Sequence, residues 1–229
     1  MSATVSSLAF GAVFGLALAA PPGPMNAVIA EESALRGWLA GFTAGLGAMT
    51  ADFLFFLLAL VGVVGFVGTM PTLRGVMVGA GGLLMLYFAY GAVRDARTAS
   101  TFTEGGGEPG HRGFVKALLL ALTNPYQILF WLTVGVGLLR PGTVDILAHA
   151  PYIGTALSGM VVVRTGSPAM IVGFFGGIVL WIVGFPASLV AAGRRIDRFA
   201  SAVAYVSALV LAGFGVFFLN EALGTFLTL

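Results

Sequence analysis

Asp52 has the clearest chemical potential in this sequence, because it stands inside the long apolar run that begins at Trp38. A charged side chain at the bilayer centre costs on the order of 3 kcal/mol on insertion scales, so a buried carboxylate needs a partner or a function. Gly41, Gly45 and Ala48 precede Asp52 at helical spacings of four, three and four residues. These small residues predict a face that packs against another helix. Asp52 is therefore a candidate for binding a substrate ammonium, carrying a coupling proton, or tying down broken backbone.

The first apolar run contains a helix break at Pro21-Pro22-Gly23-Pro24. Proline lacks an N–H donor and clashes with the preceding carbonyls, so an α-helix cannot continue through this stretch. The carbonyls that it frees must face protein or a watery cavity, since lipid cannot satisfy them. Pro22, Gly23, Pro24 and the nearby Asn26 are candidate substrate-binding residues. Asn26 could equally well satisfy the freed carbonyls.

A second break is predicted at Thr123-Asn124-Pro125 in the fourth apolar run. Asparagine is a good N-cap and proline is preorganised for the first helical position, so a half-helix should begin at Pro125. Asn124, Pro125 and Gln127 are the candidate binding residues here. Gln127 could line a cavity or merely bridge two helices.

The two predicted half-helices would each aim free N–H groups and the positive end of a helix dipole at the middle of the membrane. An anion would be stabilised between them, and a substrate carboxylate is the simplest candidate. Paired breaks in the first and fourth spans, which cross in opposite directions, are typical of an inverted repeat in a transporter.

The composition requires a membrane. Of the 229 residues 59% are hydrophobic and only 9% are charged, far from the roughly 25% charged residues of soluble domains. Six apolar runs are long enough to cross about 30 Å of hydrocarbon. The fold class predicted is therefore an all-α integral membrane protein with six transmembrane helices, arranged as a 3+3 inverted repeat with helices 1 and 4 broken. The predicted spans are residues 7–30, 38–67, 75–93, 114–139, 169–192 and 199–219.

The basic residues predict the orientation in the membrane. Eight of them fall on one side of this map, which by the positive-inside rule is cytoplasmic, and both termini then lie outside. That side holds Arg36, Arg94, Arg97, Arg112, Lys116, Arg194, Arg195 and Arg198, whereas the other holds Arg74, Arg140 and Arg164.

The chain is expected to form a single transporter domain, residues 1–229, built from two halves. Residues 1–94 form the first three-helix half, residues 95–112 a cytoplasmic connector, and residues 113–229 the second half with an external loop at 141–168. Residues 146–163 within this loop are moderately apolar, and we favour a lid or an interfacial hairpin over a seventh span.

Several classes of function are excluded by what the sequence contains. The chain has no cysteine, and His111 and His149 fall in predicted loops without Asp or Glu at metal-ligand spacing, so no metal site and no cofactor is expected. The net charge of +2 comes from scattered arginines, so the sequence contains no basic cluster of the kind that binds nucleic acid. An enzyme would need a nucleophile with a base, or a metal cluster, and we find neither.

The sequence resembles the LysE/RhtB-type amino-acid exporters, the LysE superfamily of translocators. The resemblance rests on Pro22-Gly23-Pro24, the glycines at 41, 45 and 47 before Asp52, Asn124-Pro125 followed by Leu129-Phe130, and the run from Gly82 to Gly91. Two features depart from the family pattern: Tyr126 stands where many members have lysine, and the loop at 141–168 is longer than expected.

The resemblance implies a secondary active transporter in the cytoplasmic (plasma) membrane that exports amino acids or related small metabolites. Alternating access would carry the substrate past the two broken helices and Asp52, with a proton as the coupling ion at Asp52. The expected partners are the small-molecule substrate, the coupling ion, the lipid bilayer and a possible second copy in a homodimer. Alternatives are a cation or metal-ion exporter of the same superfamily, or a membrane scaffold without transport activity.

Overall fold

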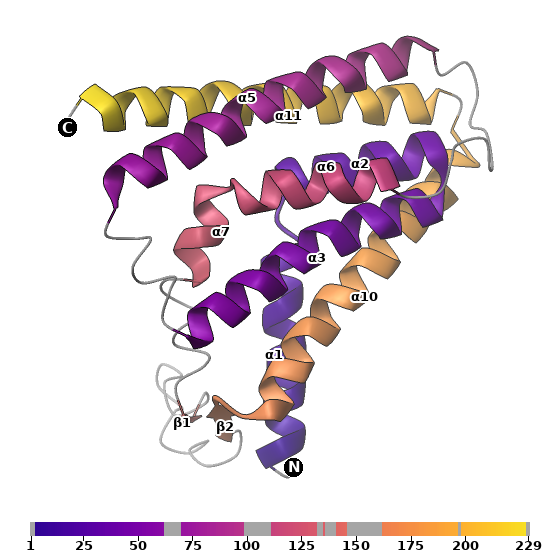
Figure 1. Cartoon of the computed structure of the whole chain (residues 1–229). Helices are drawn as coiled ribbons and strands as arrows, with labels where there is room; N and C mark the ends of the chain where they lie inside the picture. Colours follow the sequence, from indigo (N-terminus) through magenta and orange to yellow (C-terminus); the bar gives the residue numbers. More distant parts are fainter. Residues whose placement is uncertain are drawn as a thin grey trace, which may run out of the picture. The chain divides into compact units, whose positions relative to one another are not determined.

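The structure, a computed structural model, describes residues 3–61, 70–98, 111–131, 135, 141–145, 162–196 and 198–227. Helices dominate it (Figure 1). Their order is α1 (Ala3–Ala19), α2 (Pro24–Arg36), α3 (Trp38–Leu60), α5 (Pro71–Thr98), α6 (His111–Leu122), α7 (Pro125–Phe130), α10 (Pro168–Gly193) and α11 (Phe199–Leu227), with strands β1 (Gly142–Asp145) and β2 (Val162–Thr165) between α7 and α10.

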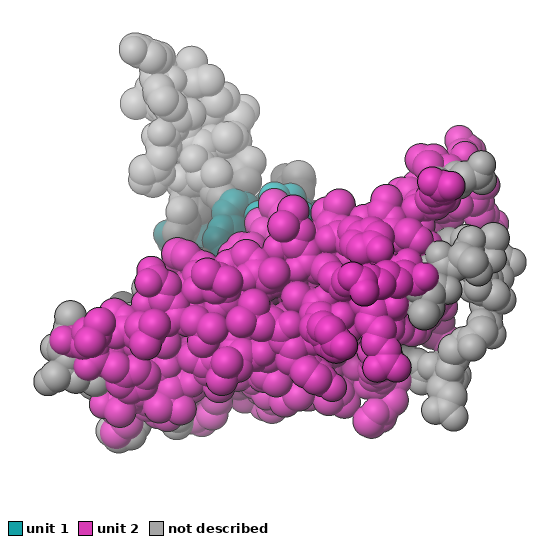
Figure 2. Space-filling model, turned by 90° about the horizontal axis from the view of Figure 1, so that it is seen from above, with its two compact units in different colours: residues 1–20, 133–181 teal, residues 21–132, 182–229 magenta. Residues whose placement is uncertain are grey.

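The chain divides into two compact units, coloured separately in Figure 2. The first unit comprises residues 1–20 and 133–181, and the second comprises residues 21–132 and 182–229. Each unit draws residues from both of the predicted three-helix halves. The division into residues 1–94 and 113–229 therefore stays a prediction.

The second unit has an apolar core that several helices share. Val28 from α2, Met85 from α5, Leu120 from α6, and Leu211 and Phe218 from α11 are almost fully buried in one cluster. Helices α5 and α11 run side by side over much of their length (Figure 1). Helix α3 packs on α2 and on α6. The elements that carry the polar residues are thus packed together within one unit.

Glycine allows the closest helix contacts of this unit. A Cβ atom at Gly82 of α5 would lie 2.9 Å from the backbone carbonyl oxygen of Gly215 in α11. A Cβ at Gly47 of α3 would overlap the carbonyl of Phe114 in α6. Transmembrane helices associate through such small residues because lipid gives apolar side chains little reason to cluster. Gly47, Gly82 and Gly215 are therefore packing residues.

The first unit contains α1, the first part of α10 and a two-stranded hairpin. Gly11 and Gly15 of α1 face the backbone of α10, while Gly173 and Gly177 of α10 face the backbone of α1. Strands β1 and β2 pair antiparallel, with Gly142 opposite Thr165. The backbone N–H of Arg164 donates a 2.8 Å hydrogen bond to the Ser7 hydroxyl, which fixes β2 to α1.

The ends of the predicted external loop therefore pair as strands. Residues 146–161 between them lie outside the described residues, so the choice between lid, hairpin and extra span for 146–163 stays a prediction. Most of the predicted connector, residues 99–110, also lies outside them. Its first residues belong to α5, which continues to Thr98.

Four described helices, α3, α5, α10 and α11, are long and apolar enough to cross a membrane. Counting α1 and α2 as one broken span gives five. The fourth predicted span is represented by α6 and the short α7, and much of its remainder, residues 132–134 and 136–139, lies outside the described residues. The all-α membrane class is supported, with the β1–β2 hairpin as a small addition.

Candidate functional site

The first helix break lies where the prolines predict it. Helix α1 ends at Ala19 and α2 begins at Pro24, with Gly23 extended at its N-cap. The side-chain amide of Asn26 donates a 2.8 Å hydrogen bond to the carbonyl oxygen of Pro21. Asn26 therefore satisfies a carbonyl that the prolines free, which is one of the two roles that the sequence allows for it.

Neither the backbone conformation nor the close packing of neighbouring atoms requires glycine at position 23. Its φ of −175° is one that any residue adopts, and a Cβ atom there would meet nothing within 4 Å. Within the described part of the chain, no atom therefore fills the space next to Gly23 at the start of α2.

The second break also lies where the sequence predicts it. Helix α6 ends at Leu122 and α7 begins at Pro125. The carbonyl oxygen of Asn124 accepts the backbone N–H groups of Gln127 and Ile128, both at 3.2 Å. Asn124 thus holds the N-cap position, because its carbonyl is the first acceptor of the new helix.

Asp52 is buried in the second unit and meets this second break. The residue is 6% exposed, and its Oδ1 accepts a 2.9 Å hydrogen bond from the indole Nε1 of Trp131. The side chain of Gln127 also hydrogen-bonds to Asp52. Two of the predicted residues, Asp52 and Gln127, are therefore in direct contact although they are 75 positions apart in the chain.

Trp131 completes this group, which we call the Asp52 cluster: Asp52, Gln127 and Trp131. Trp131 is 1% exposed, and its ring also meets the edge of Phe56 at 6.0 Å between centroids. Trp131 is not among the candidate site residues that the sequence predicts. Its position four residues after Gln127 was the one available signal, since that spacing puts both on one helical face.

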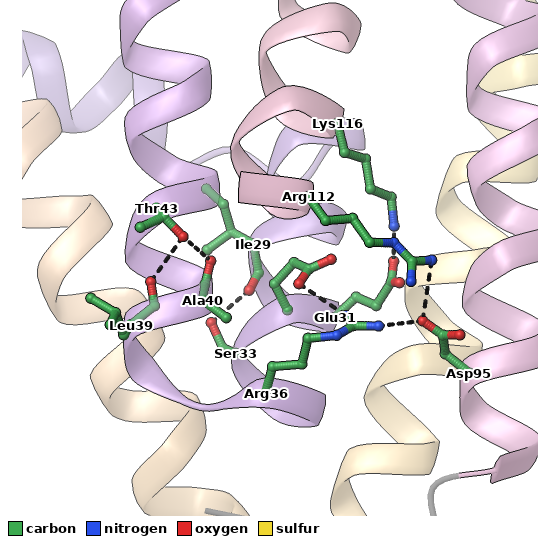
Figure 3. A network of polar contacts seen from close by, with 11 residues as sticks. Ile29, Glu31, Ser33, Arg36, Leu39, Ala40, Thr43, Asp95, Arg112 and Lys116 are labelled. Carbon is green, nitrogen blue, oxygen red and sulfur yellow. Dashed lines mark hydrogen bonds and ion pairs between the residues drawn. The ribbon is translucent and has the colours of Figure 1, made fainter. Parts of the chain in front are cut away.

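A second polar group lies inside the helix bundle, between α2, α5 and α6 (Figure 3). Lys116 of α6 and Glu31 of α2 form an ion pair with 2.6 Å between Nζ and Oε2, and their side chains are only 4% and 0% exposed. The Lys116 ammonium also lies 5.4 Å from the centre of the Phe88 ring of α5. Opposite charge and an aromatic face together compensate part of the cost of burying the ammonium.

A chain of ion pairs extends this group toward the surface. Arg36 binds Glu32, one turn earlier on α2, at 2.9 Å, and it also binds Asp95 of α5. Asp95 lies 3.5 Å from Arg112 of α6, whose side chain is 64% exposed. These four residues with Glu31 and Lys116 are called the ion-pair network below. It connects three helices through charges that are buried at one end and solvated at the other.

Two acceptor atoms of the network lack partners. Oε1 of Glu31 and Oε1 of Glu32 are buried without a hydrogen bond among the described residues. A buried acceptor left unpaired costs about 1–3 kcal/mol, and more if it is charged. The charges of both glutamates are paired through Oε2, but one oxygen of each carboxylate lacks a hydrogen bond among the described residues.

The network was not predicted from the sequence. Arg36, Arg112 and Lys116 served there only to predict the orientation in the membrane, and neither Glu31 nor Glu32, which the structure buries, was a candidate site residue. The pair Glu32 and Arg36 at i, i+4 was a usable signal. The pairing of Glu31 with Lys116, 85 residues away, had none.

The sequence of this chain is similar to those of known membrane proteins. The model of the family described as LysE type translocator matches residues 16–222 of the chain. The match includes both helix breaks, the Asp52 cluster and the ion-pair network. No solved structure matches the chain.

Three curated relatives illustrate the similarity. The putative amino acid efflux protein YcgF of Bacillus subtilis is 33% identical over 123 residues, 53% of this chain and 58% of the relative. The leucine efflux protein of Salmonella typhimurium is 31% identical over 127 residues, 54% of this chain and 57% of the relative. An uncharacterized membrane protein of Pseudomonas aeruginosa is 29% identical over 137 residues, 58% of this chain and 62% of the relative. The matches thus span about three fifths of the length of these relatives.

Proposed function

Because the chain belongs to the family of LysE type translocators, we propose that it is a secondary active transporter that exports amino acids or related small metabolites. Two of the relatives are named for the efflux of amino acids and of leucine. The family and these names support the proposed export direction and substrate class.

One structural observation supports this proposal most directly. Asp52, a carboxylate in an apolar helix, contacts Gln127 and Trp131 just after the second helix break. Broken helices with polar side chains near the membrane midplane are where secondary transporters bind their substrates and coupling ions. The Asp52 cluster is the proposed centre of the transport site.

Recognition of an amino acid needs opposite charges at its two ends. We assign the substrate carboxylate to the helix starts after Pro24 and at Pro125, whose N–H groups and dipoles attract an anion. The open space beside Gly23 is compatible with this role. Asp52 then supplies the negative charge for the substrate ammonium or for the coupling proton.

Proton coupling at Asp52 has a simple physical basis. In the resting arrangement the Asp52 carboxylate accepts hydrogen bonds from Trp131 and Gln127, which stabilise its charged form. A conformational change that separates α3 from these donors would leave the charge in an apolar site, where binding a proton or a substrate cation becomes favourable. Alternating access would thereby couple the movement of the proton to that of the substrate.

The proposed architecture has six spans in two inverted repeats of three. The broken pair α1 and α2 forms span 1, and the broken pair α6 and α7 with the residues after it forms span 4. Helices α3, α5, α10 and α11 are the remaining four. Both termini then lie on the external side of the cytoplasmic membrane.

This orientation has a direct test, because the chain has no native cysteine to mask. Single cysteines at Ala3 and at Leu227 should react with a membrane-impermeant maleimide in intact cells, whereas a cysteine at Arg195 should react only after lysis. Labelling of Arg195→Cys in intact cells with protection of both terminal cysteines would reverse the proposed topology.

The decisive experiment measures efflux of labelled leucine from proteoliposomes, with and without an imposed proton gradient. The same assay is then repeated with a panel of other amino acids, because the residues that select the substrate side chain are not identified by the Asp52 cluster alone. Gradient-driven efflux of one panel member is expected for the native protein. Asp52→Asn preserves the shape of the side chain and removes its charge, so gradient-driven efflux should be lost, because the amide cannot carry a coupling proton or pair with a substrate cation.

The matched control is Glu221→Gln, which removes a carboxylate from α11 outside the Asp52 cluster. It should retain efflux within about twofold. Native rates in Asp52→Asn under a gradient would refute the role of Asp52 while leaving export itself intact. A folded native protein that exports nothing in the panel would refute the proposed function.

A further inference from the structure

One face of α5 meets the ion-pair network. Phe88, Ala92 and Asp95 lie on this face, because their spacings of four and three residues place them on one side of the helix. Phe88 lies 5.4 Å from the Lys116 ammonium, and Asp95 pairs with the two arginines of the network. Ala92 between them is 0% exposed. We call the boundary between this face of α5 and the helices α2 and α6 the network seam.

Helix α5 meets α2 and α6 at few places in the described part of the chain. It packs chiefly on α11, and its contacts with α2 and α6 are far fewer. Asp95 links both of these helices at once, since its Oδ2 pairs with Arg36 of α2 and with Arg112 of α6 (Figure 3). Loss of this one carboxylate would therefore weaken two links across the network seam.

These two ion pairs are partly solvated. Arg36 and Asp95 are 21% and 20% exposed, and Arg112 is 64% exposed. Ion pairs that water reaches stabilise a protein weakly, because water stabilises the separated charges nearly as well as the pair does. The outer contacts of the network seam can therefore break at a lower cost than the buried pair behind them.

The groups behind Asp95 gain from the entry of water. Glu31 and Lys116 are paired at 2.6 Å with side chains that are 0% and 4% exposed. Oε1 of Glu31 and Oε1 of Glu32 are buried without a hydrogen bond among the described residues. Water in an open seam would bond to both oxygens and remove the cost of leaving them unpaired. Two states thus oppose each other, a closed one held by Asp95 and an open one favoured by hydration of the glutamates.

The network lies between the solvated end of α6 and the Asp52 cluster. Exposed Arg112 stands near the start of α6, buried Lys116 follows about one turn later, and α7 after the second break carries Gln127 of the Asp52 cluster. A solute that moves along this broken span from the Arg112 end would pass the network before it reached Asp52. In the proposed orientation that end is cytoplasmic, which is the side from which an exporter takes its substrate.

We propose that the network seam is the cytoplasmic gate of the transporter and that Asp95 is its latch, the residue whose ion pairs hold the gate closed. In this structure the gate is closed. Opening it admits the substrate toward the Asp52 cluster, and closure behind the substrate restores the ion pairs of Asp95. The passage of substrate rests on the proposed export function, whereas the opening and closing of the seam do not.

A purely structural role for Asp95 predicts a different behaviour. If its ion pairs only stabilised the fold, their loss would loosen the whole unit, including the apolar core around Val78 near the other end of α5. A latch predicts that the network seam alone opens more often. Cysteines at Ala92 in the seam and at Val78, which is 2% exposed, distinguish the two roles.

The first experiment measures how fast these cysteines react with a small thiol reagent. It uses the full-length protein in lipid nanodiscs, where the reagent reaches both faces of the membrane. Ala92→Cys or Val78→Cys is the only thiol, because the chain has no native cysteine. Asp95→Asn is added to each reporter. Asp95→Glu, which keeps the charge, and the matched control Glu221→Gln are added to Ala92→Cys. Ala96→Cys, 4% exposed beside Asp95, replaces Ala92→Cys if that variant does not fold.

Ala92→Cys should react about tenfold faster with Asp95→Asn, which corresponds to about 1.4 kcal/mol and lies within the range for two partly exposed ion pairs. Asp95→Glu should have a smaller effect, and Glu221→Gln should leave the rate within about twofold. Val78→Cys should react at an unchanged rate. Equal acceleration at both reporters would overturn the proposal, because Asp95 would then merely stabilise the fold. So would an unchanged rate at Ala92→Cys.

The second experiment locks the network seam in proteoliposomes. Asp95→Cys with Arg112→Cys is bridged by a short bifunctional thiol reagent that a reducing agent releases. Efflux by the bridged protein should be lost and should return on reduction, whereas the reagent should not change efflux by either single-cysteine variant. Undiminished efflux by the bridged protein would overturn the gate and leave the export function intact. A native protein that exports nothing would refute the proposed function, and the labelling rates would still decide whether Asp95 holds the seam closed.

Discussion

The buried ion pair between Glu31 and Lys116 makes a quantitative prediction about stability. Nζ of Lys116 lies 2.6 Å from Oε2 of Glu31, and the side chains of Glu31 and Lys116 are 0% and 4% exposed. Lys116→Met removes the charge and shortens the side chain by only one atom. Within the part of the chain that the structure describes, this change leaves neither oxygen of the Glu31 carboxylate paired, because Oε1 already lacks a partner there. Removing one partner of a buried pair typically costs about 3–5 kcal/mol.

The reciprocal change, Glu31→Leu, should cost a similar amount, because it leaves the Lys116 ammonium buried with the Phe88 ring as its remaining compensation. The double variant removes both charges and should be more stable than either single variant. Replacing a whole buried pair by apolar side chains of similar volume is often neutral or stabilising. The assay is the free energy of unfolding in mixed micelles titrated with a denaturing detergent, measured for all four proteins of the cycle.

Arg195→Met is the control for loss of one positive charge, since Arg195 is exposed and the expected change is within about 0.5 kcal/mol. The reasoning fails if the double variant loses the sum of the two single losses. It fails equally if both single variants unfold within about 1 kcal/mol of the native protein. Either outcome would mean that water or a rearranged side chain already compensates these charges.

Three further changes test other contacts by the same unfolding assay. Trp131→Phe removes the indole donor from the Asp52 carboxylate and should cost about 1.5–3 kcal/mol; a loss under 0.5 kcal/mol would show that the bond contributes little. Gly177→Ala should cost about 1–3 kcal/mol because its Cβ would overlap the backbone of α1, whereas Gly176→Ala, with open space around it, should be neutral or stabilising by up to about 1 kcal/mol. Equal effects of the two alanines would contradict this packing. Asp95→Asn should cost about 1–2 kcal/mol, because it weakens two ion pairs that are only partly buried, and added salt should narrow the difference from the native protein if this cause is correct.

The helix positions and both breaks were predictable from local sequence. Three prolines in four residues end α1, and Asn-Pro ends α6 and starts α7, through steric and hydrogen-bonding rules that act within a few residues. The apolar runs predict where α3, α5, α10 and α11 begin to within four residues, and they predict the end of α10 to within one. The ends of the other three differ more: α3 ends at Leu60 and not at 67, α5 continues to Thr98 and not 93, and α11 continues to Leu227 and not 219. The family resemblance was predictable for the same reason, because it rests on these local motifs.

The partners of the charged residues were not predictable in this way. Asp52 could be recognised as a buried carboxylate, but its contact with Trp131 joins residues that are 79 positions apart. The burial of Glu31 and Glu32 was missed, because a glutamate at the end of an apolar run reads as a boundary residue until a neighbouring helix covers it.

The sequence by itself therefore determined that this chain is a multi-pass helical membrane protein of a translocator family, where its helices break, and which carboxylate lies deepest in an apolar run. Only the tertiary structure decided that Trp131 and Gln127 hold this carboxylate, and that Lys116 neutralises Glu31 within a network of three helices. The physical reason is the range of the interactions. Helix propensity and proline sterics act between neighbours in the chain, whereas the cost of a buried charge is compensated by whichever side chains the folded packing brings within about 3 Å.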